Sequence, residues 1–89
     1  MITYSVRFTE NAKKQLKKLD KSVSAYLFNW INKNLEGCVN PRQHGKALTA
    51  NQTGIWRYRV GDYRILADIQ DDKLFILVVK AGHRRNIYI

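Results

Sequence analysis

The chain has 89 residues, 45% of them hydrophobic, and carries 16 Lys and Arg against 7 Asp and Glu, for a net charge of +9. This length fits one domain with a modest core, and the apolar content excludes a disordered tail. The single cysteine, Cys38, excludes an internal disulfide and a cysteine-based metal site. Such an excess of cations indicates a polyanion or an acidic protein as the partner. We therefore expect one domain over residues 1–89.

The sequence shows neither a leader peptide nor a membrane-spanning segment. A basic stretch followed by an apolar run is missing from the N-terminus, and no apolar run approaches the ~18 residues that cross a bilayer. We expect a cytoplasmic protein without a membrane partner. The His, Asp and Glu residues show no metal-ligand spacing, so we also expect no metal and no cofactor.

The N-terminal half predicts a strand followed by a helical hairpin. Residues 2–8 alternate apolar and polar side chains, as a half-buried strand does. Thr9 suits the N-cap of a first helix, and Asp20 or Ser22 starts a second one with an apolar stripe that ends at Gly37. The lysines of the first helix form either a solvated face or a surface that helps to dock RNA.

The C-terminal half predicts a loop and then an antiparallel three-stranded meander. Residues 40–54 (NPRQHGKALTANQTG) have the composition of a loop, in which we expect His44 to be exposed. Residues 55–79 then contain three strand-like runs separated by turn residues, and the last run is apolar on both faces, as in a central strand. The fold class is therefore α+β, with the helices packed on one face of the sheet.

The first hairpin of the meander gathers arginines. If Gly61-Asp62 forms a two-residue turn, Arg59 lies directly opposite Arg64, and Arg57 lies one step along the same face. Like charges in this position destabilise a sheet, so stability alone does not explain them. Guanidinium groups suit phosphate recognition, which indicates an anionic ligand. The alternative is a solvated sheet face on a basic protein.

The second hairpin sets the position of the basic tail. A turn at Asp71-Asp72 pairs Ile69 with Leu74 and places Arg64 beside Val79. Ala81 and His83 would then continue the face that carries the arginines.

A bulge at Gly82 would instead bring Arg84 onto that face, and the sequence leaves both arrangements open. Either way, the segment HRRNIY brings an imidazole, two guanidiniums and a phenol to the edge of the arginine patch. Its isoleucines and Tyr88 favour a docked tail over a frayed basic C-terminus.

Three segments together resemble the RelE-type toxins of the RelE/ParE superfamily: GKAL in the loop, GIWRYRVGDYRIL in the first hairpin and KAGHRRNIY in the tail. The resemblance covers essentially the whole chain and implies the RelE-like α+β fold. It also implies a ribosome-dependent, metal-independent mRNA endonuclease that an acidic, RelB-like antitoxin inhibits. In this family the ribose 2′-OH attacks the adjacent phosphate, which leaves a 2′,3′-cyclic phosphate and a 5′-OH end.

The resemblance also assigns roles to residues. Arg57 and Arg59 match two basic strand positions of the family site, Arg64 matches an arginine of the next strand, and Arg84 and Tyr88 match the arginine and tyrosine of the tail. Arg64 and Arg84 suit charge stabilisation at the phosphorane, and Tyr88 suits stacking on a base or orienting the substrate.

Further basic residues complete the expected site. Lys46 and Arg85 join Arg57 and Arg59 as expected RNA-binding residues. The best-known family members carry lysine where this chain has Arg57 and Arg59, and arginine is a poor general base because it keeps its proton. His83 is therefore the candidate acid or base, with packing or RNA contact as its alternative roles.

Two other functions compete with this interpretation. ParE-like toxins share the fold, lack nuclease activity and poison DNA gyrase by protein contact. A non-catalytic basic RNA-binding module would also explain the charge, although exposed aromatic residues on the open sheet face would then be expected for stacking on single strands.

Overall fold

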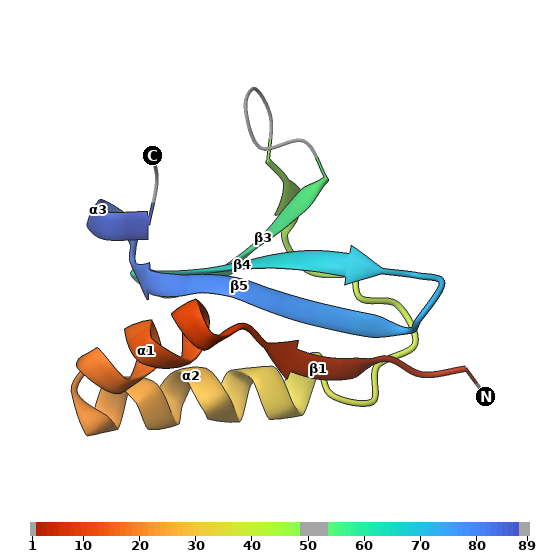
Figure 1. Ribbon diagram of the computed structural model, residues 1–89. Helices are drawn as coiled ribbons and strands as arrows, with labels where there is room; N and C mark the ends of the chain where they lie inside the picture. Colours follow the sequence, from red (N-terminus) through yellow and green to blue (C-terminus); the bar gives the residue numbers. More distant parts are fainter. Residues whose placement is uncertain (1, 49–53, 88–89) are drawn as a thin grey trace.

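The computed structural model describes residues 2–48 and 54–87, and its strands form one five-stranded sheet (Figure 1). The strand order is β1-β5-β4-β3-β2. The elements are, in chain order, β1 (Ser5–Phe8), α1 (Glu10–Lys18), α2 (Lys21–Asn34), β2 (Lys46–Ala47), β3 (Ile55–Val60), β4 (Tyr63–Gln70), β5 (Phe75–His83) and α3 (Arg84–Ile87).

The predicted strand and helical hairpin of the N-terminal half are confirmed. The Thr9 hydroxyl caps α1 by accepting a hydrogen bond from the Ala12 N–H at 3.1 Å. Asp20 precedes α2, and Gly37 follows the helix with a φ of +76°, a conformation that glycine adopts without strain.

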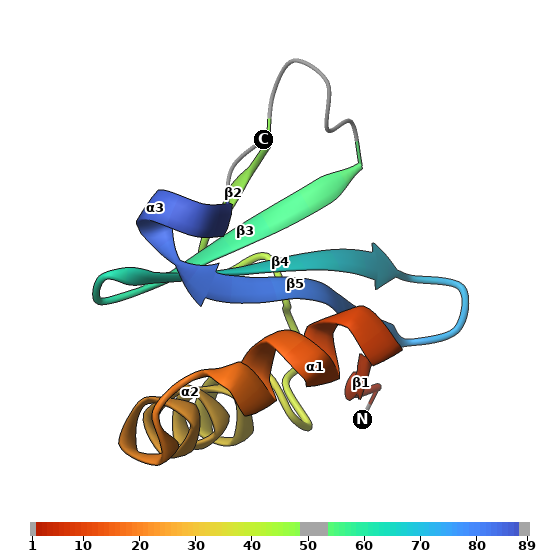
Figure 2. The same cartoon turned by 60° about the vertical axis from the view of Figure 1, so that its left-hand side comes forward.

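The sheet separates two faces. Figures 1 and 2 show α1 and α2 on one face, here called the helix face, and α3 on the other. We call this other face, which carries Arg57, Arg59 and Arg64, the arginine face. The core lies between the sheet and the two long helices. Its buried side chains are Ala12, Leu16, Leu27, Ile31, Leu35, Tyr58, Val60, Ile65, Ala67, Ile76, Val78 and Ala81.

The strand β5 lies inside the sheet, between β1 and β4. It pairs in parallel with β1, starting at Ser5 opposite Phe75, and in antiparallel fashion with β4. The prediction that this run is a central strand is confirmed in the sense that β5 has a neighbouring strand at each edge.

The first hairpin has the predicted register. Val60 pairs with Tyr63 and Arg59 with Arg64. Gly61 takes a φ of +60° at the first central position, where the tight hairpin turns that match strand twist favour glycine.

The second hairpin differs from the prediction. Residues 71–74 form a longer turn, so Gln70 pairs with Phe75 and Ile69 with Ile76 rather than with Leu74. Leu74 takes a φ of +57° within this turn, and its carbonyl accepts a hydrogen bond from the Ser5 N–H. The contact with β1 thus holds Leu74 outside the β4–β5 ladder, and this contact is not visible in the local turn sequence.

A β-bulge in β5 changes the face of the residues that follow it. Leu66 pairs with Lys80 whereas Ala67 pairs with Val78, so Val79 is an extra residue in β5. A shift by one residue exchanges the two faces of a strand. The bulge lies at Val79 and not at Gly82. Together, the longer turn and the bulge make Arg64 pair with Gly82 instead of Val79.

Candidate nucleic-acid site on the arginine face

The arginine face carries its cations in two neighbouring rows across the sheet. Residues that pair directly across strands project on the same side. The first row runs Lys46, Arg57, Leu66, Lys80. The second row runs Arg59, Arg64, Gly82. The strands thus bring five cationic side chains from four strands onto one face.

Arg59 and Arg64 stand close together at the end of the first hairpin. Val60 and Tyr63 close its two-residue turn, so the next pair, Arg59 and Arg64, is of the type that lacks mutual backbone hydrogen bonds. Side chains in such pairs are the closer ones in an antiparallel ladder. Like charges held at this separation repel each other, and an anion between them would remove the repulsion.

The guanidinium of Arg64 is held by the hairpin turn. Its Nη1 donates to the carbonyl oxygens of Gly61 at 3.0 Å and Tyr63 at 2.9 Å, and only 7% of the residue is exposed. Its Nε is buried and, within the described residues, has no hydrogen-bond partner. A buried donor without an acceptor is costly, and a phosphate oxygen would satisfy it.

The helix α3 begins beside the same turn. The Arg84 N–H donates to the Asp62 carbonyl oxygen at 2.8 Å. The side chains of Arg84 and Arg85 are exposed. The Gly61-Asp62 turn therefore holds both arginines: Arg64 through its guanidinium and Arg84 through its backbone N–H at the start of α3.

The tail packs on the arginine face as far as the structure describes it. Ile87 is 2% exposed, and a Cβ added at Gly82 would lie 3.9 Å from the Ile87 Cδ1. Leu66, in the neighbouring strand, is also buried on this face. The tail is therefore docked through Ile87 and not frayed at that point. Tyr88 lies outside the described residues.

His83 does not continue the arginine face as expected. It pairs with Tyr63, and the two rings meet edge to face with centroids 5.4 Å apart. Tyr63 packs against the core, and Ala81 lies within it, so this alternation of β5 belongs to the helix face. The His83 Nδ1 accepts a hydrogen bond from the Arg85 N–H at 3.2 Å. The physical reason for the difference is the bulge at Val79.

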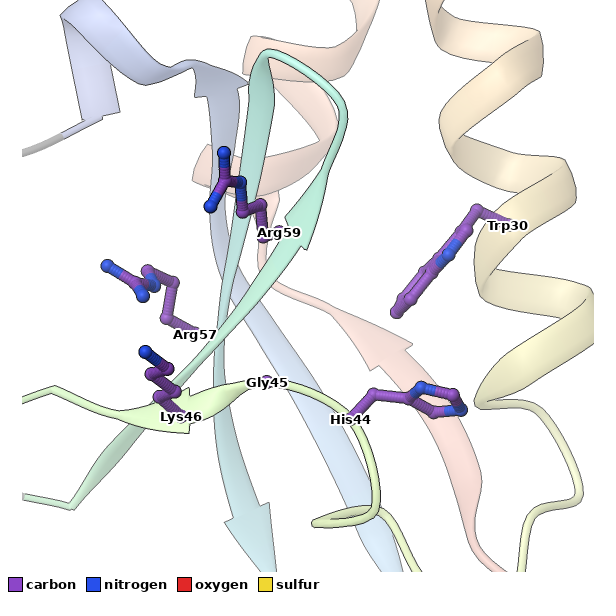
Figure 3. Close-up of a pocket in the computed structure, with 6 residues that line it drawn as sticks. All are labelled: Trp30, His44, Gly45, Lys46, Arg57 and Arg59. Atoms are coloured by element: carbon purple, nitrogen blue, oxygen red, sulfur yellow. The ribbon is translucent and has the colours of Figure 1, made fainter.

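A pocket of about 330 Å³ opens at the start of β2, next to the arginine face. Figure 3 shows Lys46, Arg57 and Arg59 on one side of β3 and the rings of Trp30 and His44 on the other. Gly45 lies between the two groups. Each of these residues lines the pocket, which therefore extends around the edge of β3.

Two residues of this region have roles that the sequence analysis missed. His44 is partly buried and not exposed, because its ring meets Trp30 edge to face at 5.8 Å. Lys80 reaches the arginine face only through the bulge at Val79, for which the local sequence carries no signal. Just after the bulge, β5 is bonded to α1: the Gln15 Oε1 accepts a hydrogen bond from the Ala81 N–H at 2.9 Å.

Residues 2–48 and 54–87 hold neither a metal-ligand cluster nor a helix that could cross a membrane. Within these ranges, no three His, Cys, Asp or Glu side chains gather as ligands for a metal ion. None of the helices in the same ranges combines the length and apolar composition that a membrane crossing requires.

Comparison with known proteins gives consistent matches. A family model described as the ParE toxin of the type II toxin–antitoxin system parDE matches residues 6–88. Toxin RelG of Mycobacterium tuberculosis is 32% identical over 85 residues, which cover 96% of this chain and 95% of that protein.

Solved structures show the same fold. The toxin–antitoxin complex RelBE2 of M. tuberculosis matches with a TM-score of 0.85 and 30% identity, over 97% of each chain. The isolated E. coli RelE toxin matches with a TM-score of 0.69 and 22% identity, over 91% of this chain and 84% of that chain.

These matches define the class of the protein: the chain belongs to the ParE toxin family, within the RelE/ParE superfamily. More particularly, it is a RelE-family toxin of a type II toxin–antitoxin system.

Proposed function

We propose that this toxin is a ribosome-dependent mRNA endonuclease and that the arginine face binds the mRNA backbone at the bond to be cut. The observation that carries the proposal is Arg64, which is buried, fixed by the Gly61 and Tyr63 carbonyls, and left with an unsatisfied Nε donor beside Arg59. Donors that are fixed before the reaction stabilise developing charge without reorganisation.

The reaction is an internal transfer at phosphorus. The 2′-oxygen forms a bond to the adjacent phosphorus, the bond from phosphorus to the 5′-oxygen breaks, and the proton of the 2′-OH is transferred away while the leaving oxygen gains one. The negative charge grows on the non-bridging oxygens. Arg64 and Arg84 stabilise it, and Arg57, Arg59 and Arg85 neutralise flanking phosphates.

The proton of the 2′-OH requires an acceptor. Arginine keeps its proton, whereas lysine releases one more readily. Lys46 and Lys80 are the lysines of the two cationic rows. We assign the proton transfer to one of these lysines, because His83 packs against Tyr63 and its Nδ1 already accepts a hydrogen bond.

A translating cell-free extract tests the proposal. Purified toxin is added to a defined mRNA, and the 5′ ends of fragments are mapped by primer extension, with ribosome-free mRNA as the control. We expect cuts within the reading frame that require ribosomes, persist when free metal is chelated after the ribosomes have stalled, and disappear in Arg84→Ala. Intact mRNA under normal translation would contradict the proposal.

The partner that restrains this activity is an acidic antitoxin. The net charge is +9, and the solved complexes of RelBE2 and of E. coli RelBE each contain an antitoxin. We propose that an Asp- and Glu-rich segment, disordered alone, folds over the arginine face. Its affinity should fall with added salt, since long-range charge attraction is screened.

A second candidate function is gyrase poisoning. The family model that matches residues 6–88 is described as a ParE toxin, and this favours testing it. A gyrase poison that acts by protein contact has no need for a fixed phosphate site. A supercoiling assay with purified gyrase separates the two functions, because the nuclease proposal expects no inhibition and the loss of toxicity in Arg64→Ala.

A further inference from the structure

We propose that the pocket at the start of β2 is a base-binding subsite. The Trp30 and His44 rings receive one nucleobase, and Lys46, Arg57 and Arg59 hold the adjoining phosphates. This inference rests on the proposed function in one respect: RNA must lie on the arginine face. It adds a base-binding side on the opposite side of β3, formed by Trp30 and His44, which belong to neither cationic row.

The size and lining of the pocket fit one nucleotide. A volume of about 330 Å³ lies at the small end of ligand sites. Cations line one side and two aromatic rings line the other, with the edge of β3 between them (Figure 3). A nucleotide joins an anionic group to a planar ring, so its two parts match the two sides of this pocket.

The aromatic side is fixed in advance. The Trp56 Nε1 donates to the His44 carbonyl oxygen at 2.6 Å, and this bond anchors the loop that precedes β2. The Tyr58 hydroxyl donates to the Pro41 carbonyl oxygen at 2.6 Å and anchors the start of the same loop. Trp30 packs on the Tyr58 ring with centroids 5.7 Å apart. These contacts hold both pocket rings without help from a ligand.

Gly45 allows the pocket to form. Its φ is +83°, and a Cβ at this position would collide with the Arg57 carbonyl oxygen and lie 2.8 Å from the Trp56 Nε1. The loop therefore runs against β3 at this point because no side chain intervenes. This close approach turns the chain from His44 on the aromatic side to Lys46 on the cationic side.

The edge of β3 supplies polar groups for a base. Among the described residues, β2 pairs with β3 only from Lys46–Arg57 to Ala47–Trp56. The Leu48 N–H donates to the Ile55 carbonyl oxygen, so alternate residues of β3 direct their backbone groups toward this edge. Arg59 is the next residue in that alternation and lies beyond Lys46, the first residue of β2. Its N–H and C=O are placed to bond the edge of a base.

Short oligonucleotides test the subsite without ribosomes. One probe is a 2′-O-methyl RNA tetranucleotide, which lacks the attacking hydroxyl, and its partner probe has the same backbone without bases. The affinity of each probe is measured for the purified toxin and for His44→Ala. We expect His44→Ala to weaken binding of the base-bearing probe by about 5- to 150-fold, the range for one stacked base, and to leave the abasic probe unchanged.

Two controls protect the result. Tyr26→Ala removes an exposed ring one helical turn before Trp30 and should bind both probes normally. In the wild-type toxin, the base-bearing probe should shift the NMR signal of the Trp30 indole N–H, and the abasic probe should not. This second measurement remains decisive if His44→Ala does not fold. Equal effects of His44→Ala on the two probes would overturn the subsite.

The experiment also separates the subsite from the proposed function. Arg59→Gln should weaken both probes. If Arg59→Gln affects neither probe, RNA does not lie on the arginine face and both proposals fail. If Arg59→Gln weakens both and His44→Ala weakens neither, only the subsite fails. If the base-bearing probe shifts the NMR signal of the Arg59 backbone amide but not that of the Trp30 indole N–H, the edge of β3 binds as it would to another strand. The subsite then fails.

Discussion

Arg64 and Arg84 are fastened to the same two-residue turn, one through its guanidinium and the other through its backbone N–H. The Gly61 carbonyl accepts from the Arg64 Nη1, and the Asp62 carbonyl accepts from the Arg84 N–H. Residues separated by twenty positions in the sequence are thus placed by one short turn. The relative position of the two guanidiniums depends on this turn.

Arg64→Lys should reduce cleavage strongly although it keeps the charge. A lysine ammonium cannot reproduce the planar set of donors that bonds the Gly61 and Tyr63 carbonyls and still presents Nε. We expect single-turnover cleavage on stalled ribosomes to fall by about 10²- to 10³-fold, as when one fixed donor is lost. Lys14→Arg on α1 serves as the matched control, and equal cleavage by wild type and Arg64→Lys would contradict the role.

Lys80→Gln should lower RNA affinity without changing sequence preference. Lys80 lies in the same row as Arg57, on the face that binds the RNA backbone in our proposal, and a cation at this position attracts phosphate whether or not it also takes part in proton transfer. Its loss should reduce the slope of log affinity against log salt by about 0.7 for a single strand. Titrations of short RNA at several salt concentrations measure the slope. An unchanged slope would place Lys80 outside the RNA path.

His83→Asn should retain most of the cleavage activity. The asparagine side-chain oxygen can accept from the Arg85 N–H in place of the Nδ1, but it cannot act as an acid or base near neutral pH. Single-turnover rates across pH are the measurement, and the profile should keep its shape. A large loss of rate in His83→Asn, with normal RNA binding, would assign proton transfer to His83.

Gln15→Ala should destabilise the protein by about 1–3 kcal/mol, the cost of leaving a buried backbone donor unsatisfied. The Gln15 Oε1 accepts from the Ala81 N–H, and Ala81 is buried. Chemical denaturation measures the change in the free energy of unfolding. Lys14→Ala, exposed on the same helix, is the control and should lie within about 0.5 kcal/mol of wild type.

Arg42→Gln should lower stability at neutral pH and make little difference in strong acid. The Arg42 guanidinium and the Tyr4 hydroxyl both bond Asp71, and these bonds lower the pKa of the Asp71 carboxyl from 3.8 to about 2. A lowered folded-state pKa contributes stability above the ordinary pKa, and this contribution is lost as the pH falls toward about 2.

The Tm of wild type should therefore exceed that of Arg42→Gln at neutral pH, and the difference should shrink as the pH falls from about 4 to 2. The difference should be small, because both side chains are partly exposed. Thermal melts of both proteins at several pH values provide the test. A difference that does not depend on pH would show that the ion pair is not its source.

Local sequence patterns were sufficient for much of the fold. The alternation in β1, the Thr9 cap and the two-residue turn at Gly61 each depend on neighbours in the chain, and each is present in the structure. The opposition of Arg59 and Arg64 follows directly from that turn. These features are set by backbone geometry and side-chain period, which the sequence displays.

Long-range contacts decided what the sequence could not show. The Ser5 N–H of β1 bonds the Leu74 carbonyl in the turn before β5, and the Gln15 side chain of α1 bonds the Ala81 N–H just after the bulge at Val79. The bulge shifts the alternation by one residue, which moves Lys80 onto the arginine face and His83 away from it. The pocket at His44 likewise depends on Trp30 of α2, which lies far from the loop in sequence.

The position of β5 also governs when the toxin can become active. It is synthesised after the other four strands, yet it lies between β1 and β4 and joins them into one sheet. A nascent chain that lacks β5 cannot hold β1 on the sheet, complete the rows of cations or anchor α3. If the arginine face binds RNA as proposed, a growing chain has no complete RNA-binding face, and toxicity should begin only after β5 has emerged.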